Sequence, residues 1–250
     1  MKVLVTGGAG FIGSKLVLEL IEREYSVVIL DNLSTQIHGE DPSNSYTFNL
    51  VRSKCELIVG DVMDTKVWEK ALNGVDILVH LAAETGTGQS MYQISKYIDV
   101  NIGGTAKMLE MVSNTKNQVK KIIIAASRAV YGEGKYECKE HGVVYPLSRL
   151  NDDLSTGDYE VKCPICASNV ILLPTDEESK LHPTSVYGFT KQSQEELCMI
   201  VGKSINIPVV SFRFQNVYGP GQSLKNPYTG ILSIFSTRIK NGNDLNIFED

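Results

Sequence analysis

A glycine-rich turn lies directly behind the first apolar segment of the chain. The segment from Lys2 to Thr6 has the pattern of a buried strand, residues 7–13 contain four glycines, and helix-like sequence runs from Phe11 to Glu24. In such a turn one glycine permits the tight bend, one lets bare backbone approach a pyrophosphate, and one lets helix pack on strand. The N–H groups of the helix N-terminus then face the phosphates. The pattern predicts a dinucleotide site at Gly7, Gly10, Phe11, Ile12 and Gly13.

A second apolar segment, Ser26 to Asp31, ends in a carboxylate. It lies about 20 residues behind the glycines, where a dinucleotide fold reads the ribose hydroxyls of NAD. A carboxylate at that place repels the 2′-phosphate of NADP, so Asp31 favours NAD. The alternative is a loop that is rich in glycine by chance. In that case the adjacent strand, the adjacent helix and the position of Asp31 would each be a coincidence.

Composition places the chain among soluble globular proteins. It has 250 residues, 42% of them apolar, enough for one large domain or one and a half ordinary ones. The formal charge of -5 comes without a basic run, so we expect neither nucleic acid nor an anionic membrane as a partner. Neither a signal peptide nor an apolar stretch of membrane-spanning length is present. We therefore expect a cytoplasmic protein with reduced thiols.

Strand-like and helix-like segments alternate along most of the chain. Further buried strands are expected at 56–60, 75–81, 120–126 and 207–213, and helices at 185–203 and near 229–240. Strands that alternate with helices indicate an α/β fold with a doubly wound parallel sheet. Residues 131–183 interrupt this rhythm, because they are rich in Gly, Asp, Ser, Pro and Cys and lack a long helical period. We interpret that stretch as an insertion.

Tyr187 and Lys191 stand four residues apart at the start of the expected helix, so both side chains project from one face. A nearby ammonium group, together with a positive nicotinamide, favours the phenolate form of a tyrosine, which is otherwise a poor base at neutral pH. The alternative is an ordinary surface pair. The position behind the fifth strand of a dinucleotide fold favours catalysis.

With the segment from Ser127 to Gly132, these features resemble the extended short-chain dehydrogenase/reductase family, specifically its NAD-dependent nucleotide-sugar epimerases and dehydratases. The resemblance runs from Lys2 to the last residue. The motifs that carry it are the glycine turn, Asp31-Asn32, Gly60-Asp61-Val62, His80 to Ala83, Val100-Asn101, Gly104-Thr105, Ser127 four residues before Tyr131, the Tyr187/Lys191 pair, and Arg213 to Pro220.

The resemblance implies a role for each matching residue. Ser127 would hydrogen-bond the reacting sugar hydroxyl, Tyr187 would be the acid/base and Lys191 would hold the nicotinamide ribose. Asn216 falls where the family contacts the substrate diphosphate. The alternatives are a helix cap for Ser127 and a buried polar residue for Asn101. The expected cofactor-binding residues are Gly7, Gly10, Phe11, Ile12, Gly13, Asp31, Asn32, Asp61, Val62, Leu81, Ala82, Ala83, Asn101, Tyr187 and Lys191.

The residues behind Ser127 bear on the type of reaction. Family members that eliminate water carry an Asp-Glu pair there, and the decarboxylating branch carries a Glu, whereas this chain has Arg128 and Ala129. Without these acids, the resemblance leaves a reaction in which hydride is removed from the sugar and then returned to it. We therefore expect 4-epimerisation of a nucleotide-linked hexose. The alternatives are a nucleotide-sugar 4-ketoreductase or dehydrogenase, and a catalytically silent NAD-binding protein. A homodimer is left open.

The insertion holds two short pairs of metal-ligating residues. Cys138 and His141 are followed, 21 intervening residues later, by Cys163 and Cys166. Two pairs with two-residue spacing among turn-forming neighbours predict a closed tetrahedral zinc site. The alternatives are a redox Cys-x-x-Cys pair and unligated thiols, with His141 as a surface residue. A segment this poor in apolar residues lacks a core of its own, for which a metal can substitute.

The insertion, with the segments 85–91 and 226–230, resembles the subgroup of dTDP-L-rhamnose 4-epimerases and related O-antigen sugar enzymes. We expect four regions: 1–131 as an NAD-binding Rossmann domain, 132–183 as a zinc-ribbon-like insertion, 184–214 as the Rossmann domain continued, and 215–250 as the start of a substrate lobe. Family members continue for roughly 80 to 100 residues beyond the point that matches 247–250. The resemblance therefore implies a truncated or pared-down substrate lobe.

Overall fold

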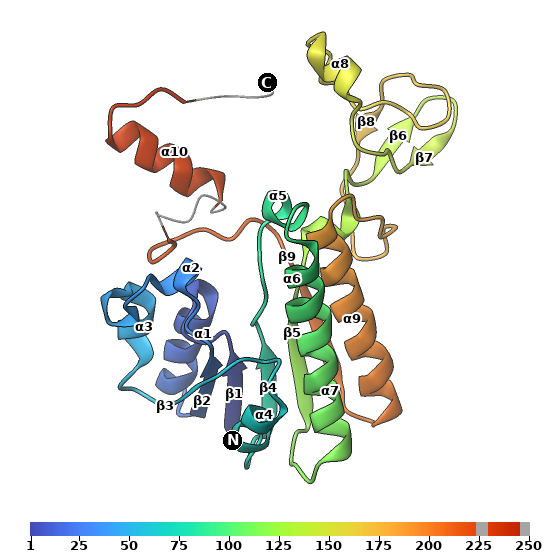
Figure 1. Cartoon of the computed structure of the whole chain (residues 1–250). Helices are drawn as coiled ribbons and strands as arrows, with labels where there is room; N and C mark the ends of the chain where they lie inside the picture. The colour runs from blue at the N-terminus through green and yellow to red at the C-terminus, as the bar shows by residue number, and fades with distance from the viewer. Residues whose placement is uncertain (224–229, 246–250) are drawn as a thin grey trace.

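The computed structural model describes residues 1–223 and 230–245, and its centre is a six-stranded parallel sheet (Figure 1). The strand order is β3-β2-β1-β4-β5-β9, and all five pairings are parallel. This confirms the expected doubly wound α/β class. The strands are β1 (Lys2–Thr6), β2 (Ser26–Asp31), β3 (Glu56–Val59), β4 (Ile77–His80), β5 (Lys121–Ser127) and β9 (Val209–Phe214).

Alternate side chains of each strand enter two separate cores. Val3 and Val5 pack with the helices on one face of the sheet, and Leu4 packs on the other. The first face is covered by α1 (Phe11–Glu22) and α3 (Tyr46–Val51). The second is covered by α4 (Thr65–Ala71), α7 (Gly104–Asn114) and α9 (Val186–Ser204). With both faces covered, the strands are apolar throughout rather than alternating, as the sequence shows.

Trp68 of α4 is the largest side chain of the second core and is fully buried. Its indole N–H donates to the carbonyl of Val62 at 2.8 Å, so the buried ring leaves no polar atom unsatisfied. Burial of a large aromatic side chain stabilises a fold by about 2 to 3 kcal/mol. The bond also holds the loop behind β3 against the sheet.

The order of the strands reverses direction at β1. The chain runs outward from β1 to β2 and β3, then returns to the other side of β1 with β4 and continues outward with β5 and β9. Ligands of open α/β sheets bind at such a switch point, outside the carboxyl ends of the strands. The loops behind β1, β2 and β4 therefore define the site.

Short helices occupy these loops. Behind β2 lie α2 (Thr35–His38) and the 3-10 turn Pro42–Asn44, and behind β4 lie α5 (Thr87–Ser90) and α6 (Ile94–Tyr97). A π-helical segment, Ile98–Gly103, joins α6 to α7, and a 3-10 turn, Arg128–Tyr131, follows β5.

Helix α1 ends two residues before the expected boundary at Glu24. Glu24 has a φ of 62°, and the N–H of Tyr25 donates to the carbonyl of Leu20 at 3.0 Å. A left-handed residue with this bond ends a helix by satisfying its last carbonyls. The helical period of the sequence alone did not indicate that stop.

Residues 132–183 form a separate small sheet beyond the carboxyl end of β5 (Figure 1). It consists of β6 (Tyr136–Cys138), β7 (Gly142–Val144) and β8 (Ile171–Leu172), antiparallel in the order β7-β6-β8, with α8 (Asn151–Ser155) in the long loop. Its core holds Cys138, Val144 and Cys163, with three half-buried neighbours. Such a small apolar core gives little stability by itself.

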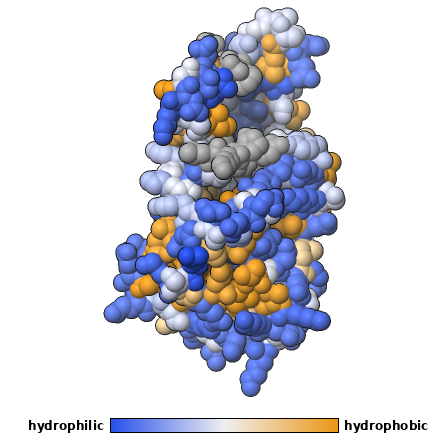
Figure 2. All heavy atoms as spheres, turned by 60° about the vertical axis from the view of Figure 1, so that its left-hand side comes forward, coloured by the Kyte–Doolittle hydropathy of each residue, from blue (hydrophilic) through white to orange (hydrophobic). Residues whose placement is uncertain are grey.

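Behind β9 the chain reaches α10 (Ile231–Lys240), which corresponds to the helix expected near 229–240. The motif residues 226–229 and the terminal residues 247–250 lie outside the described residues. Within residues 1–223 and 230–245, none of the helices has the length and apolar character that crossing a bilayer requires. The face in Figure 2 is hydrophilic over much of its area, and its most extended apolar area lies in the lower half.

Candidate functional site

A cavity of about 1700 Å³ lies at the carboxyl ends of the sheet strands. It brings together most of the residues that the sequence singled out, from loops behind β1, β2, β3, β4, β5 and β9. The expected site residues that line it are Gly7, Gly10, Phe11, Ile12, Gly13, Asp31, Asn32, Val62, Leu81, Ala82, Ala83, Ser127, Tyr187, Lys191 and Asn216.

The glycine turn forms the floor of one part of this cavity. Gly7 has a φ of 68°, and a side chain there would come within 2.9 Å of the backbone nitrogen of Ala82. Gly13 lies so close to the carbonyl of Gly7 that a Cβ would overlap it. Gly10 precedes the first turn of α1 and has no side chain to cap it. The N–H groups of that turn thus remain available to a phosphate group.

Asp31 ends β2 and is held by two backbone N–H groups. Its Oδ2 accepts from Ala9 at 2.9 Å, and its Oδ1 accepts from Leu33 at 2.9 Å. The side chain is only 8% exposed, yet it lines the cavity. A carboxylate fixed in this way presents its remaining lone pairs to ribose hydroxyls and its charge to any phosphate beside them.

His38 is a residue of this region that the sequence analysis missed. Its Nε2 lies 3.9 Å from Oδ1 of Asp31, and its Nδ1 lies 2.9 Å from the hydroxyl of Ser45. Burial lowers the pKa of His38, and the charge of Asp31 opposes this only in part. The ring is therefore neutral at pH 7 and leaves the charge of Asp31 uncompensated. A lone histidine within Thr35–His38 carried no periodic or motif signal.

Tyr187, Lys191 and Ser127 converge at the other end of the cavity. Ser185 caps α9 through a bond from Gly188 N to its hydroxyl at 3.0 Å, which starts the helix just before Tyr187. Lys191 lies one turn later, with Nζ 6.0 Å from the centre of the Tyr187 ring and 2.9 Å from the carbonyl of Ala125. Ser127, at the end of β5, accepts from Ala129 N at 3.2 Å through its hydroxyl, which also acts on the pKa of Tyr187.

The pKa values of Tyr187 and Lys191 differ from the expectation that a nearby ammonium group favours the phenolate of Tyr187. Burial raises the pKa of Tyr187, and the hydrogen bond with Ser127 opposes that rise. Burial also lowers the pKa of Lys191 to about 8. Without cofactor, desolvation therefore disfavours the charged forms of both side chains, which differs from the expectation that Lys191 favours the phenolate of Tyr187.

Asp61 and Asn101 do not line the cavity. Asp61 accepts from the Asn32 amide at 3.0 Å and from the backbone of Met63 at 2.9 Å. Asn101 is fully buried, and its amide bonds the backbone of Glu84 in both directions, at 2.8 and 3.1 Å, and the Thr190 hydroxyl at 2.9 Å. This placement agrees with the alternative of a buried polar residue. Both side chains position residues or loops that do line the cavity.

A buried polar chain supports the wall behind the glycine turn. The ring of His80 lies between two threonine hydroxyls, with Nδ1 2.8 Å from Thr6 and Nε2 3.3 Å from Thr105. The Thr6 hydroxyl also accepts from Ala82 N at 3.1 Å. Burial, together with the charge of Lys191, lowers the pKa of His80 to about 3, so the ring is a neutral spacer.

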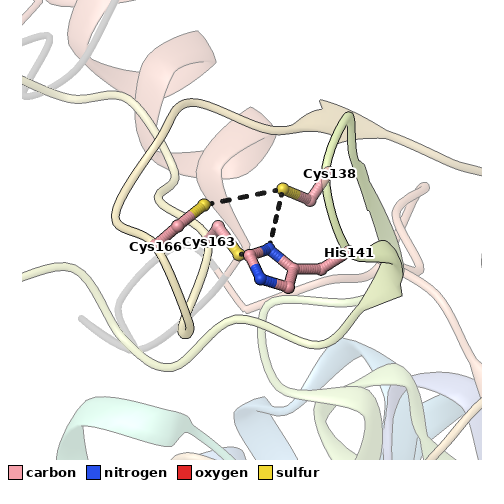
Figure 3. A group of neighbouring side chains, drawn as sticks. All are labelled: Cys138, His141, Cys163 and Cys166. Atoms are coloured by element: carbon pink, nitrogen blue, oxygen red, sulfur yellow. Dashed lines mark hydrogen bonds between the residues drawn. The ribbon is translucent and has the colours of Figure 1, made fainter.

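The predicted metal ligands come together in the insertion (Figure 3). Cys138 and His141 extend from the β6–β7 hairpin, and Cys163 and Cys166 from one tight turn. Sγ of Cys138 lies 3.7 Å from Sγ of Cys166 and 3.5 Å from Nδ1 of His141, and Sγ of Cys163 lies 3.8 Å from the same nitrogen. All four ligand atoms lie within 4.8 Å of one another.

Each pair ends in the same backbone shape. Gly142, behind His141, has a φ of 66°, and Ala167, behind Cys166, has a φ of 59°. The backbone N–H of Ile165 donates to Sγ of Cys163 at 3.4 Å. The hydrogen bond with His141 lowers the pKa of the Cys138 thiol to about 6. Left-handed backbone behind the second ligand folds each pair back, so that both ligands of a pair face one point.

Comparison with known proteins agrees with this geometry. A model of the NAD dependent epimerase/dehydratase family matches residues 3–149 and 166–250, and the break falls within the insertion. The dTDP-L-rhamnose 4-epimerase of Burkholderia thailandensis is 38% identical over 252 residues, covering 100% of this chain and 67% of the relative. The putative UDP-glucose 4-epimerase of Methanocaldococcus jannaschii is 32% identical and covers 99% and 66%.

Solved structures show the same likeness. The Thermotoga maritima UDP-glucose 4-epimerase with UDP-glucose has a TM-score of 0.75 at 28% identity, with 100% of this chain and 66% of that chain covered. The Thermus thermophilus UDP-glucose 4-epimerase in complex with NAD has a TM-score of 0.72 at 26% identity, with 98% and 64% covered. The chain spans about two thirds of the length of these relatives. The family model and the full-chain relatives together show that the chain belongs to the NAD dependent epimerase/dehydratase family.

Proposed function

We propose that the chain binds NAD and serves the 4-epimerisation of a nucleotide-linked hexose. The observation that carries the proposal is the arrangement of one cavity, with the glycine turn and Asp31 at one end and Ser127, Tyr187 and Lys191 at the other. The first set suits a diphosphate and a ribose, and the second suits proton transfer at a sugar hydroxyl. The solved NAD and UDP-glucose complexes of 4-epimerases support the assignment.

Tyr187 would take the proton of the C4 hydroxyl while Ser127 orients that hydroxyl. Bound NAD, held by the glycine turn, Asp31 and Lys191, would supply a reversible acceptor for the C4 hydride, so that the transient 4-keto sugar could take the hydride back on its opposite face. Tyr187 then gives the proton back, so atoms and electrons balance without a further reactant. The positive charge of bound NAD would lower the pKa of the Tyr187 phenol and so oppose the rise that burial causes.

Lys191 would hold the nicotinamide ribose while it keeps its bond to Ala125. Its lowered pKa, about 8, still leaves it mostly charged at pH 7. Asn216 would contact the substrate diphosphate, and its Oδ1 lies 3.4 Å from Nε of Arg128. Arg128 adds a positive charge beside that contact, at a position where other branches of the family carry an acid.

The 38% identical relative makes dTDP-L-rhamnose the first substrate to test, with UDP-glucose second. Purified protein would be incubated with dTDP- and UDP-hexoses, and the C4 epimers would be separated by chromatography with NADH followed at 340 nm. Epimer formation without net NADH supports the proposal. Accumulation of NADH with a keto sugar would favour the second candidate, a 4-dehydrogenase or ketoreductase that uses the same residues.

We propose that Cys138, His141, Cys163 and Cys166 hold a structural zinc ion. Two thiolates bound tetrahedrally at about 2.3 Å lie about 3.8 Å apart. The observed separation of 3.7 Å for Cys138 and Cys166 fits that edge. Four protein ligands leave no open position for a substrate, so the metal would have a structural role and stabilise residues 132–183. In this proposal, residues 132–183 are an insertion between the Rossmann segments 1–131 and 184–214. Residues 215–250 are the start of a substrate lobe.

We also propose a reducing, cytoplasmic setting, because the proposed zinc site requires Cys138, Cys163 and Cys166 as reduced thiolates. We also propose a homodimer through α6 and α9. Ile94, Phe189 and Ile200 are 52%, 52% and 67% exposed on these two helices, whose residues pack against each other. Burial of such side chains is a usual source of association. Light scattering should show a dimer, and Phe189→Glu should shift it toward monomer.

A further inference from the structure

Two glutamines from distant parts of the chain pair their side-chain amides in both directions. Nε2 of Gln36 donates to Oε1 of Gln89 at 2.9 Å, and Nε2 of Gln89 donates to Oε1 of Gln36 at 3.1 Å. Gln36 belongs to α2 and Gln89 to α5, 53 residues apart. We refer to this pair as the glutamine bridge.

The sheet order shows what the bridge spans. Helix α2 follows β2 and α5 follows β4, and β1 lies between these two strands. A contact between the two loops therefore crosses above the carboxyl end of β1, where the glycine turn begins. Gln36 and the neighbours of Gln89 at Thr85 and Thr87 line the same cavity as that turn. A molecule bound at the glycine turn would therefore occupy a cavity that Gln36 also lines.

The two ends of the bridge differ in how firmly they are held. Gln89 is 4% exposed, and it also donates to Oε1 of Gln93 at 3.1 Å and accepts from the Tyr97 hydroxyl at 3.4 Å. Tyr97 is fully buried and donates to the carbonyl of Thr85 at 2.6 Å. Gln36 is half-buried on a four-residue helix. Gln89 is thus the fixed end, and Gln36 is the end that can move away.

The fixed end also contacts the helix that carries the acid/base. The hydroxyl of Ser90, next to Gln89, accepts from the backbone N–H of Tyr187 at 3.0 Å. The ring of Tyr97 meets the Tyr187 ring edge-on, with centres 6.4 Å apart. The bridge therefore connects the loop behind Asp31 with the start of α9.

We infer that the glutamine bridge is a latch that opens to admit the dinucleotide and closes above it, which slows its release between two hydride transfers. The inference rests on the proposed function, because an epimerase must return the hydride from the same cofactor molecule that received it. Release of reduced cofactor after the first transfer would leave the keto sugar without its hydride. Gln36 and Gln89 act here as positioning residues and not as catalytic ones.

A latch that is closed without ligand slows both the entry and the release of the dinucleotide. A side chain that only contacts the bound cofactor would slow its release alone, so the two explanations can be distinguished. The test is stopped-flow fluorescence of NADH with the full chain, with association measured on mixing and release measured on displacement by excess NAD. Gln36→Ala should raise both rates roughly tenfold, because two bonds of ordinary net strength are lost. The NADH dissociation constant should change less than about threefold.

Gln89→Ala should have the same effect, and the double variant should add little to either single one, because each change alone breaks both bonds. Gln192→Ala is the matched control, since its amide pairs with Glu196 on the exposed face of α9, at 2.8 Å. Unchanged rates in Gln36→Ala, with an unchanged unfolding midpoint, would overturn the latch. Faster release with unchanged association would overturn it too, in favour of direct contact. Absence of NADH binding by the unmodified protein would instead contradict the proposed function.

Discussion

The ammonium group of Lys191 lies 6.0 Å from the centre of the Tyr187 ring and is buried with an exposure of 3%. Its bond to the carbonyl of Ala125 compensates only part of the loss of water around the charge. The lysine thus reduces the stability of the protein without cofactor, at a position where function requires a charge. Such a conflict between stability and function is common at active sites.

Lys191→Met should stabilise the cofactor-free protein at pH 7. The pKa of Lys191 falls from 10.5 to about 8 on folding, so between these values the unfolded chain binds more protons and stability rises with pH. The cost of the buried charge is complete below about pH 8 and gone above about 10.5. We expect a gain of about 1 to 3 kcal/mol at pH 7 that shrinks toward pH 10.

Urea unfolding of both proteins at pH 7, 8.5 and 10 measures this difference. NAD affinity should fall in the same variant, because the methionine cannot bind the ribose. A gain that stays constant with pH would show that packing, and not the charge, is responsible.

Tyr187→Phe should abolish turnover and leave NAD affinity nearly unchanged. The phenyl ring keeps its edge-on contact with Tyr97, whereas the proton acceptor is lost. Loss of a general acid/base lowers kcat by about 10² to 10⁴-fold. Epimer formation and NAD calorimetry on the same sample check both parts, and appreciable activity in the variant would contradict the mechanism.

The elements that sequence patterns predicted are those with local signals. The continuous apolar run from Val3 to Val5 predicted a buried strand, and the four-residue spacing of Tyr187 and Lys191 placed both on one helix face. Paired spacing likewise predicted that Cys138 and His141 lie close together, and their ligand atoms do so in the structure. In each case the physical cause acts within a few residues of the chain.

The features that sequence patterns missed depend on contacts between distant loops. His38 and the glutamine bridge arise because the loops behind β2 and β4 meet, which no local pattern encodes. The direction of the Tyr187 pKa shift also depends on burial, which outweighs the opposing hydrogen bond with Ser127. The motif left open whether Asn101 binds the cofactor or is a buried polar residue, and the π-helical segment directs its side chain to Glu84 and Thr190.

Asp31 should make the protein bind NAD much more tightly than NADP. Its charge is uncompensated, because His38 is neutral, so a 2′-phosphate beside it is repelled. Asp31→Ala should narrow the gap between the two dissociation constants, measured by calorimetry. Asp64→Ala is a suitable control, since Asp64 caps α4 through Lys66 N at 2.9 Å and does not line the cavity. Equal affinities of the unmodified protein for both cofactors would contradict the assignment.

One zinc ion per chain should be found by elemental analysis, and Cys163→Ser should lose it. The ligands lie outside the glycine turn and α9, so metal removal should loosen residues 132–183 first and affect NAD affinity only indirectly. Cys55→Ser is the matched control, because Cys55 is a half-buried thiol outside the cluster. Limited proteolysis should cut the insertion after chelation and spare it when zinc is restored. Equal protease resistance with and without metal would mean that Cys138, Cys163 and Cys166 need another explanation, because a structural ion must stabilise the segment that its ligands span.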